Sequence, residues 1–178
     1  MYNNKPVISK IFEMVLMQIF SSQLQSDHLQ YGFKRNSSCS QAIYTLRTVV
    51  ERHIKSGSTV TLCALDISKA FDRVDHFALL QLLLDRHLPN NFVAIFYNWF
   101  LKCNIYVRWA TALSYPFTVR AGVRQGGILS PVLFAVYVDE LIVRLKSASI
   151  GCKLLENYCL LYADDIILLA HTLNDMQC

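Results

Sequence analysis

The chain has 178 residues, of which 53% are hydrophobic and 17% are charged, and its formal net charge at pH 7 is +4. The composition predicts one folded domain, and no apolar run reaches the roughly 18 residues of a transmembrane helix, which argues against a membrane protein. A charged fraction below the usual value of about 25% predicts an apolar surface, as on a piece of a larger protein whose other parts cover it.

Apolar spacing and terminal signals predict four helices and one strand in the first part of the chain. They cover residues 9–24, 38–54, 59–66 (the strand), 75–87 and 89–102. The second helix opens with the capping-box pair Ser38 and Gln41 and ends near Gly57. Asp75 is expected to cap the third helix, and Pro89 to open the fourth.

The second part of the chain alternates strands with one long helix. Residues 105–109 and 116–120 are expected to form a strand pair, and 153–155 a short strand. Ser130 as N-cap and Pro131 at the first helical position begin a helix over 131–145. The whole pattern predicts an α+β fold, in which an antiparallel sheet is backed by helices.

Two adjacent carboxylates interrupt the apolar end of the chain. Asp164 and Asp165 lie between the runs 159–161 and 166–170, which predicts a tight β-hairpin with a negatively charged turn. Burying such a pair is unfavourable unless a cation neutralises it, and the simplest one is a divalent metal. Asp66 closes the strand 59–66, so pairing of this strand with the hairpin would bring Asp66 close to Asp164.

Carboxylates of this kind are ligands for Mg²⁺, together with substrate phosphates and water. Two such ions about 3.5–4 Å apart could assist phosphoryl transfer. The competing interpretation is that all three are ordinary surface aspartates in turns, and it is the more common one for an isolated Asp-Asp pair.

A glycine-rich loop at 121–131 leads into the long helix. Its backbone can approach a ligand closely at Gly126, while Arg124 supplies fixed charge and Gln125 supplies hydrogen-bonding groups for a nucleotide or phosphate. Taken alone, the segment is more typical of an ordinary capped turn.

Taken together, four segments resemble the reverse transcriptases, most closely those of non-LTR retrotransposons and group II introns. The segments are similar to motif A, motif B, motif C and the fingers block of that family, and they are, in that order, Asp66–His76, Gly122–Pro131, Tyr162–Asp165 and Gln30–Ser38. The resemblance implies a polymerase palm with interleaved fingers. It also implies an RNA-directed DNA polymerase that transfers deoxynucleotides to a primer 3′-hydroxyl on an RNA template.

The resemblance further implies roles for the acidic residues. Asp66 and Asp164 match the two principal metal-binding carboxylates, Asp165 matches the third, and the backbone carbonyl of Ile67 matches a further ligand. Asp165 ranks below Asp164, because adjacent side chains of a regular strand face opposite ways. The implied cofactors are two Mg²⁺ ions, with Mn²⁺ as the alternative.

Other residues match nucleotide and template contacts of the family. Phe71 matches an aromatic steric gate that excludes a ribose 2′-hydroxyl, although it could equally be a core aromatic. Arg124, Gln125 and Gly126 match motif B contacts with the nucleotide. The fingers block implies contacts with the template or triphosphate for Phe33, Lys34 and Arg35. Lys34 stands where many relatives carry Arg, which keeps the charge but loses the planar fork.

The expected organisation is one partial domain, with fingers mainly at 1–58 and 86–121 and palm mainly at 59–85 and 122–178. A helical thumb and upstream fingers residues of a parent polyprotein are expected to be absent. The implied partners are an RNA template, a DNA primer and deoxynucleotides. Six cysteines without a Cys-x-x-Cys pair argue against zinc ribbons and are typical of an intracellular protein.

Two other functions stay open. The chain could be an inactive retroelement remnant that binds nucleic acid without turnover, which would follow from its expected truncation. A viral RNA-dependent RNA polymerase shares the palm, but Ala163 and Phe71 argue against it.

Overall fold

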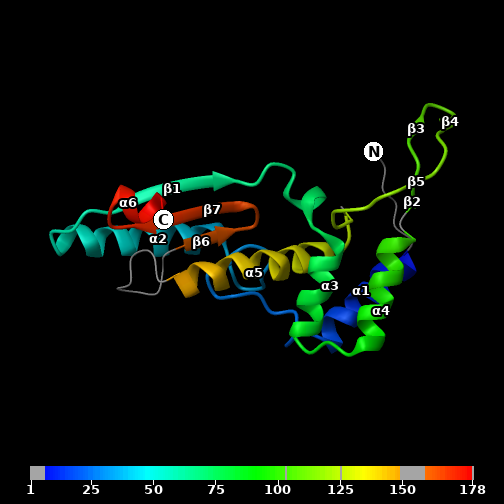
Figure 1. Cartoon of the computed structure of the whole chain (residues 1–178), viewed down its shortest axis with the longest axis horizontal. Coiled ribbons are helices and arrows are strands. Elements are labelled where there is room, and N and C mark those ends of the chain that lie inside the picture. The colour runs from blue at the N-terminus through cyan, green and yellow to red at the C-terminus, as the bar shows by residue number, and fades with distance from the viewer. Residues whose placement is uncertain (1–6, 103, 125, 149–158, 178) are drawn as a thin grey trace. The chain divides into compact units, whose positions relative to one another are not determined.

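A computed structural model describes residues 7–102, 104–124, 126–148 and 159–177 of the chain (Figure 1). The chain divides into two compact units, each made of two segments. Unit 1 comprises Met1–Gln25 and Lys69–Tyr137, and unit 2 comprises Ser26–Ser68 and Val138–Cys178. Among the described residues, no helix combines the length and apolar character needed to span a bilayer.

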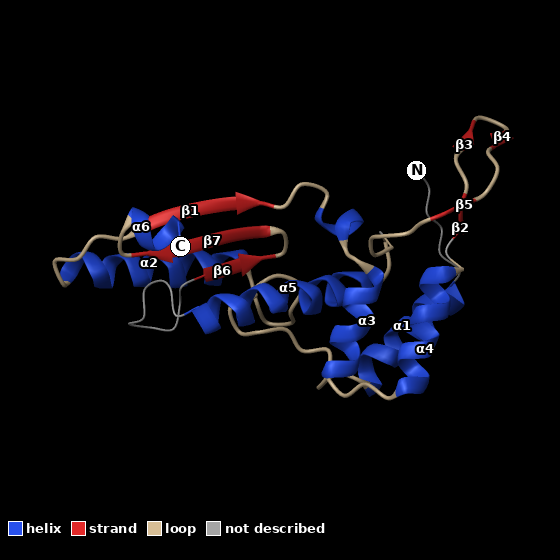
Figure 2. Ribbon diagram, viewed as in Figure 1, coloured by secondary structure: helices blue, strands red, loops and turns tan. Residues whose placement is uncertain are grey.

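Unit 2 contains a three-stranded antiparallel sheet in the order β1-β7-β6 (Figure 2). Its elements are α2 (Cys39–Lys55), β1 (Thr61–Asp66), β6 (Cys159–Tyr162), β7 (Asp165–Ala170) and α6 (Leu173–Gln177). The strands form because they are short aliphatic runs, and Val49 of α2 packs against Leu160 and Leu169 of the sheet. The predicted α+β fold with an antiparallel sheet is confirmed.

Unit 1 is mainly helical. Its elements are α1 (Val7–Ile19), the 3₁₀ helix η1 (Ala70–Arg73), α3 (His76–Asp85), α4 (Asn90–Leu101) and four two-residue strands, β2 (Asn104–Ile105), β3 (Arg108–Trp109), β4 (Ala112–Leu113) and β5 (Phe117–Thr118). The Phe20 ring meets the Phe92 ring edge-on at 4.3 Å between centroids. Leu83 of α3 and Phe96 of α4 are also buried.

The predicted helix starts agree with the structure where a side chain caps them. Both hydrogen bonds of the capping box between Ser38 and Gln41 form, and the Asp75 carboxylate accepts from the Ala78 amide at 2.8 Å. Pro89 is the N-cap of α4. The first helix was expected to reach Leu24 but ends at Ile19, followed by a turn.

One local prediction is confirmed in part, one is wrong and one cannot be compared. The expected strand pair over 105–109 and 116–120 forms between β2 and β5, but it is interrupted after Ile105, and the residues beyond the interruption pair as β3 with β4. The long helix, α5 (Ser130–Ala148), includes Ser130, whose hydroxyl donates to the Arg124 carbonyl at 2.5 Å and does not act as the expected N-cap. The strand predicted at 153–155 lies outside the described residues.

Candidate active site

The three acidic residues lie together at one end of the sheet in unit 2. Asp66 ends β1 and is the register partner of Asp165, which begins β7. Asp164 precedes Asp165 in the turn, and its carbonyl accepts a 3.3 Å hydrogen bond from the Ile67 amide. Antiparallel pairing therefore brings residues almost a hundred positions apart to one place, because the end of one strand meets the start of the other.

The acidic turn is held by residues that the sequence did not single out for this purpose. The buried side chain of Gln30 accepts from the Ala163 amide at 3.1 Å and donates to the Ala163 carbonyl at 3.3 Å. Its oxygen also accepts from the Gly32 amide at 2.8 Å. Ala163 needs this support because its φ of 59° is in the left-handed region. The signal for Gln30 was its place at the start of the fingers block.

Gly32 packs directly against the same turn. A Cβ atom at this position would lie 2.3 Å from the Ala163 nitrogen, so only glycine fits. The neighbouring backbone also pairs with β6, because the Tyr31 amide donates to the Leu161 carbonyl at 2.7 Å. The fingers block thus shapes the acidic hairpin through its backbone.

The chemistry of the acidic residues fits a hard divalent cation. Asp66 and Asp165 are exposed and Asp164 is half-buried, so solvent and a substrate can reach them. The described residues contain no cluster of three or more metal-binding side chains. Carboxylates are the type of ligand that Mg²⁺ takes, together with substrate phosphates and water, but the side chains of the three aspartates are not gathered into one ligand cluster in this structure.

Phe71 lies in η1 of unit 1 and is fixed on two sides. Its ring stacks on Phe134 with centroids 4.8 Å apart, and its carbonyl accepts from the Val123 amide at 2.8 Å. Gly122 packs directly against the backbone of Asp72. A Cβ atom at Gly122 would lie 2.9 Å from the Asp72 Cα atom, and the φ of Gly122 is 95°, so glycine is favoured for both reasons. Phe71 and the start of the glycine loop therefore form one hydrogen-bonded structure.

The end of the glycine loop depends on a buried carboxylate from α1. The Glu13 side chain, which is fully buried, accepts from the Ile128 amide at 2.6 Å and from the Leu129 amide at 3.2 Å. Sequence reasoning missed this residue, and its only signal was a charge inside an apolar helix. Of the predicted loop contacts, Arg124 is half-buried, Gly126 is exposed, and Gln125 lies outside the described residues.

A cavity of about 710 Å³ opens beside this loop within unit 1. Glu13, His76, Arg124 and Gly126 are among its lining residues. The His76 ring holds the loop at the other side of the cavity, with its Nε2 atom 2.8 Å from the Gly122 carbonyl. The structure thus brings Phe71 together with the loop in unit 1, and Asp66 together with Asp164 and Asp165 in unit 2.

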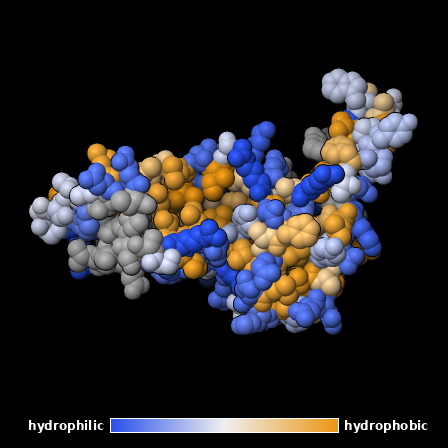
Figure 3. Space-filling view, in the orientation of Figure 1, coloured by the Kyte–Doolittle hydropathy of each residue, from blue (hydrophilic) through white to orange (hydrophobic). Residues whose placement is uncertain are grey.

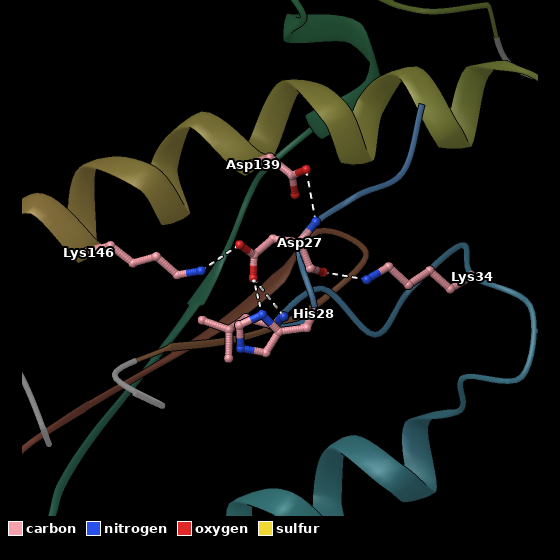
Figure 4. A network of polar contacts seen from close by, with 6 residues as sticks. Asp27, His28, Lys34, Asp139 and Lys146 are labelled. Atoms are coloured by element: carbon pink, nitrogen blue, oxygen red, sulfur yellow. Dashed lines mark hydrogen bonds and ion pairs between the residues drawn. The ribbon is translucent and has the colours of Figure 1, made fainter. Parts of the chain in front are cut away.

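The fingers-block residues have different surroundings. Phe33 and Arg35 are exposed. The Lys34 amine instead donates to the Asp27 carbonyl in a network of polar contacts (Figure 4). Burial lowers the pKa of Lys34, and the carboxylates of Asp139 and Asp27 oppose that effect. Lys34 therefore holds its own chain in this structure, and its contact with a template stays a prediction.

Asp27 is the centre of that network (Figure 4). Its carboxylate accepts from the Lys146 amine at 2.6 Å and from the Leu29 amide at 3.0 Å, and its own amide donates to Asp139 at 3.0 Å. Burial alone would raise the pKa of Asp27, but the Leu29 and Lys146 hydrogen bonds together hold it below its ordinary value. Burial also raises the pKa of the nearby Cys159 thiol to about 12, with Asp27 as a second cause.

Comparison with protein families matches nearly the whole chain. The model of the family described as reverse transcriptase (RNA-dependent DNA polymerase) matches residues 2–178. A probable RNA-directed DNA polymerase from transposon X-element of Drosophila melanogaster is 30% identical over 88% of this chain and 18% of its own length. The Pol polyprotein of the retrotransposable element R2DM, from the same organism, is 28% identical over 96% of this chain and 16% of its own length.

More distant relatives agree. The group II intron-encoded protein LtrA of Lactococcus lactis is 27% identical over 76% of this chain and 20% of its own length. The chain thus spans about a fifth or less of these curated relatives. Telomerase from Candida tropicalis has a similar fold, with a TM-score of 0.69 at 15% identity over 97% of this chain and 30% of the telomerase chain. A second structure of that telomerase, in the apo form and truncated from its C-terminal domain, gives a TM-score of 0.65 at 13% identity over 96% of this chain and 35% of its own length.

Proposed function

Because the chain belongs to the reverse transcriptase (RNA-dependent DNA polymerase) family, we propose that it carries the central fingers and palm of an RNA-directed DNA polymerase. The reaction is the addition of deoxynucleotides to the 3′-hydroxyl of a DNA primer on an RNA template. The observation that carries the proposal is the meeting of Asp66, Asp164 and Asp165 at one end of the sheet.

The acidic residues are proposed to be the metal-binding part of the site. Asp66 and Asp164, with Asp165 and the carbonyl of Ile67, would hold two Mg²⁺ ions, or Mn²⁺ in their place. Such a pair of ions, when bound, activates the attacking oxygen and stabilises the leaving one in phosphoryl transfer. The two hydrogen bonds between Gln30 and the Ala163 backbone hold the turn that carries Asp164 and Asp165, so the backbone of the proposed site is fixed before the substrate arrives.

Phe71 is proposed to select the sugar of the incoming nucleotide. Its stacking on Phe134 and the bond from Val123 to its carbonyl restrict the movement of the ring. A fixed ring can reject an extra hydroxyl by steric contact, whereas a mobile ring would yield. Arg124, Gln125 and Gly126 are proposed to contact the same nucleotide.

The remaining assignments follow the family. Phe33, Lys34 and Arg35 are proposed to lie near the template or the triphosphate. The fingers are proposed to comprise mainly 1–58 and 86–121, and the palm mainly 59–85 and 122–178.

Primer extension on an RNA template tests the function. In the protein that carries this chain, Asp164→Asn should abolish extension, because it removes a carboxylate while keeping the shape of the side chain. Asp85→Asn, an exposed site at the end of α3, is the matched control and should extend normally. Extension by D164N at the wild-type rate would overturn the metal assignment. A wild-type protein that binds template and primer but never extends would support the inactive remnant instead.

A further inference from the structure

The hairpin formed by β2, β3, β4 and β5 in unit 1 exposes aromatic side chains to an unusual degree. Tyr115 is 93% exposed and Trp109 is 83% exposed, while Tyr106 and Phe117 on the same hairpin are about half exposed. Figure 3 shows the hairpin as a projection at the upper right, with side chains mostly of intermediate hydropathy and no continuous hydrophobic patch. Single exposed rings are common on protein surfaces, but four exposed aromatic side chains gathered on one short hairpin indicate a binding surface.

The same hairpin is positively charged. The sequence has no Asp or Glu between Asp85 and Asp139, and that stretch contains five basic residues: Arg86, Lys102, Arg108, Arg120 and Arg124. Arg108 and Arg120 lie on or beside the hairpin and are exposed. Within the described residues, no carboxylate lies at salt-bridge distance from either of them. Arg108 donates from its Nε atom to the Ala110 carbonyl at 3.2 Å, but no carboxylate neutralises the charge of either arginine within the described residues.

Hydrogen bonds make the hairpin a fixed platform despite its short strands. The Val107 amide donates to the Ser114 hydroxyl, and the Ser114 amide donates to the Val107 carbonyl, each at 2.9 Å. Nearer the base, the Thr118 hydroxyl donates to the Asn104 side chain at 3.1 Å. The aromatic rings are therefore presented on an ordered backbone, which lowers the entropy lost when a ligand binds.

We propose that this hairpin binds single-stranded RNA, with Trp109 and Tyr115 stacking on unpaired bases and with Arg108 and Arg120 contacting phosphates. Exposed rings combined with arginine and the absence of acidic residues are the features of single-strand binding surfaces. Protein interfaces are also rich in Trp, Tyr and Arg, so the feature that favours a polyanion over a protein is the absence of Asp and Glu between Asp85 and Asp139. RNA is the strand chosen because the proposal rests on the proposed function, in which the template is RNA and stays unpaired until it is copied.

Fluorescence anisotropy with the full chain tests the surface. The probe is a labelled RNA of mixed sequence, about 15 nucleotides long, which covers the usual site size of such platforms. The double variant W109A/Y115A should weaken RNA binding about 5-fold or more for each ring lost. The variant W109F/Y115F keeps both rings and should bind within about 2-fold of the wild type. The exposed Tyr44 of α2 gives the matched control Tyr44→Ala, which should not change binding.

The arginines are tested through the salt dependence of the same binding. R108Q/R120Q should lower the slope of log Kd against log salt concentration by about 1.4, because each phosphate contact on a single strand contributes about 0.7. The control R52Q/K55Q removes the same charge from the exposed part of α2 and should leave the slope unchanged. Circular dichroism checks that every variant is folded. Equal losses in the hairpin and control variants would show diffuse charge attraction and overturn the proposal.

Further binding measurements with the same variants identify the partner of the hairpin. An RNA–DNA duplex should show a smaller effect of W109A/Y115A than the single-stranded RNA does, because its bases are already stacked and paired. An equal effect on the duplex would overturn the stacking of Trp109 and Tyr115 on unpaired bases. If the variants bind RNA normally but reduce self-association or capture of a protein, the hairpin is a protein contact and the RNA proposal is wrong.

The RNA-binding test of the hairpin and the primer-extension test of the acidic residues can fail independently of each other. RNA binding through the hairpin requires no nucleotide addition, so D164N should bind the RNA probe as the wild type does. Loss of extension in D164N with unchanged RNA binding in the hairpin variants would remove only the hairpin proposal. Loss of RNA binding in the hairpin variants, with extension unaffected by D164N, would remove only the polymerase assignment of the carboxylates.

Discussion

The carboxylate of Glu13 accepts a 2.6 Å hydrogen bond from the backbone amide of Ile128, although the two residues are far apart in the sequence. Glu13 belongs to α1, and Ile128 belongs to the loop that leads into α5. The same oxygen accepts from the Leu129 amide, so one side chain satisfies two donors just before the helix begins. A negative charge at this position is also favourable for the helix dipole.

Removal of the Glu13 carboxylate should destabilise unit 1. Glu13→Ala leaves two amide donors without this acceptor and creates a cavity, with an expected loss of about 2–4 kcal/mol in the free energy of unfolding. Glu13→Gln keeps an acceptor oxygen and should lose about 1 kcal/mol. Denaturant unfolding measures both. Met14→Ala, on the exposed side of the same helix, is the control, and an E13A loss no larger than that of M14A would contradict the role of Glu13.

Gly32→Ala should disrupt the acidic hairpin. The new Cβ atom would meet the Ala163 nitrogen at 2.3 Å, and backbone on both sides must move to relieve the contact. We expect a loss of more than about 2 kcal/mol in stability and a strong loss of primer extension. Gly57→Ala is the control for backbone strain alone. Its new Cβ atom would meet nothing within 4 Å, so only the positive φ of Gly57 makes this substitution unfavourable. A G32A variant as stable as G57A would refute the close packing.

Phe71→Ala should relax the choice of sugar. Without the ring, a ribose 2′-hydroxyl meets no steric barrier, so the preference for deoxynucleotides, measured as a ratio of kcat/KM values, should fall at least about 10-fold, or about 1.4 kcal/mol. Single-nucleotide incorporation with each type of nucleotide gives the ratio. Phe77→Ala, at an exposed position of α3, should leave it unchanged. An unaltered ratio in F71A would restrict Phe71 to a packing role.

Asp27 should make the stability of unit 2 depend on pH in the acidic range. Its pKa is held below the ordinary value of 3.8 in the folded state, so its stabilising effect is present above that value and is lost as the pH falls through the lower folded pKa. Asp27→Asn should therefore be less stable than the wild type at pH 7, and the difference should shrink below about pH 4. Denaturant unfolding across this range measures it. Lys146→Met should reduce the pH dependence by removing one cause of the shift, and a difference that does not vary with pH would refute the linkage.

Cys159 should resist alkylation in the folded protein. Its pKa of about 12 leaves almost no thiolate at pH 8, and the side chain is buried. Cys39 is exposed and serves as the internal control. Mass spectrometry after brief treatment with iodoacetamide should find Cys39 modified and Cys159 unmodified until denaturant is added. Equal labelling of the two would show that β6 opens readily.

Much of the local structure was predictable because its causes are local. Ser38 with Gln41, and Asp75 with Ala78, are separated by three residues, so their capping bonds follow from the sequence alone. The aliphatic runs of β1 and β7 each predict a strand in the same way. The hairpin over 104–118 was less predictable, since its break at Val107 and Ser114 depends on a side-chain hydroxyl bonding across the strands.

The sequence by itself determined which motifs the chain contains, and it predicts that Asp66, Phe71, Asp164 and Asp165 carry the chemistry, because their residue types and spacing are visible in the chain. Only the tertiary structure decided what holds them. Gln30 and Gly32 support the acidic turn, and Glu13 supports the glycine loop, through contacts across more than a hundred residues. Such contacts leave no periodic pattern in the chain, because a buried carboxylate or amide is satisfied by whichever backbone group the fold brings to it.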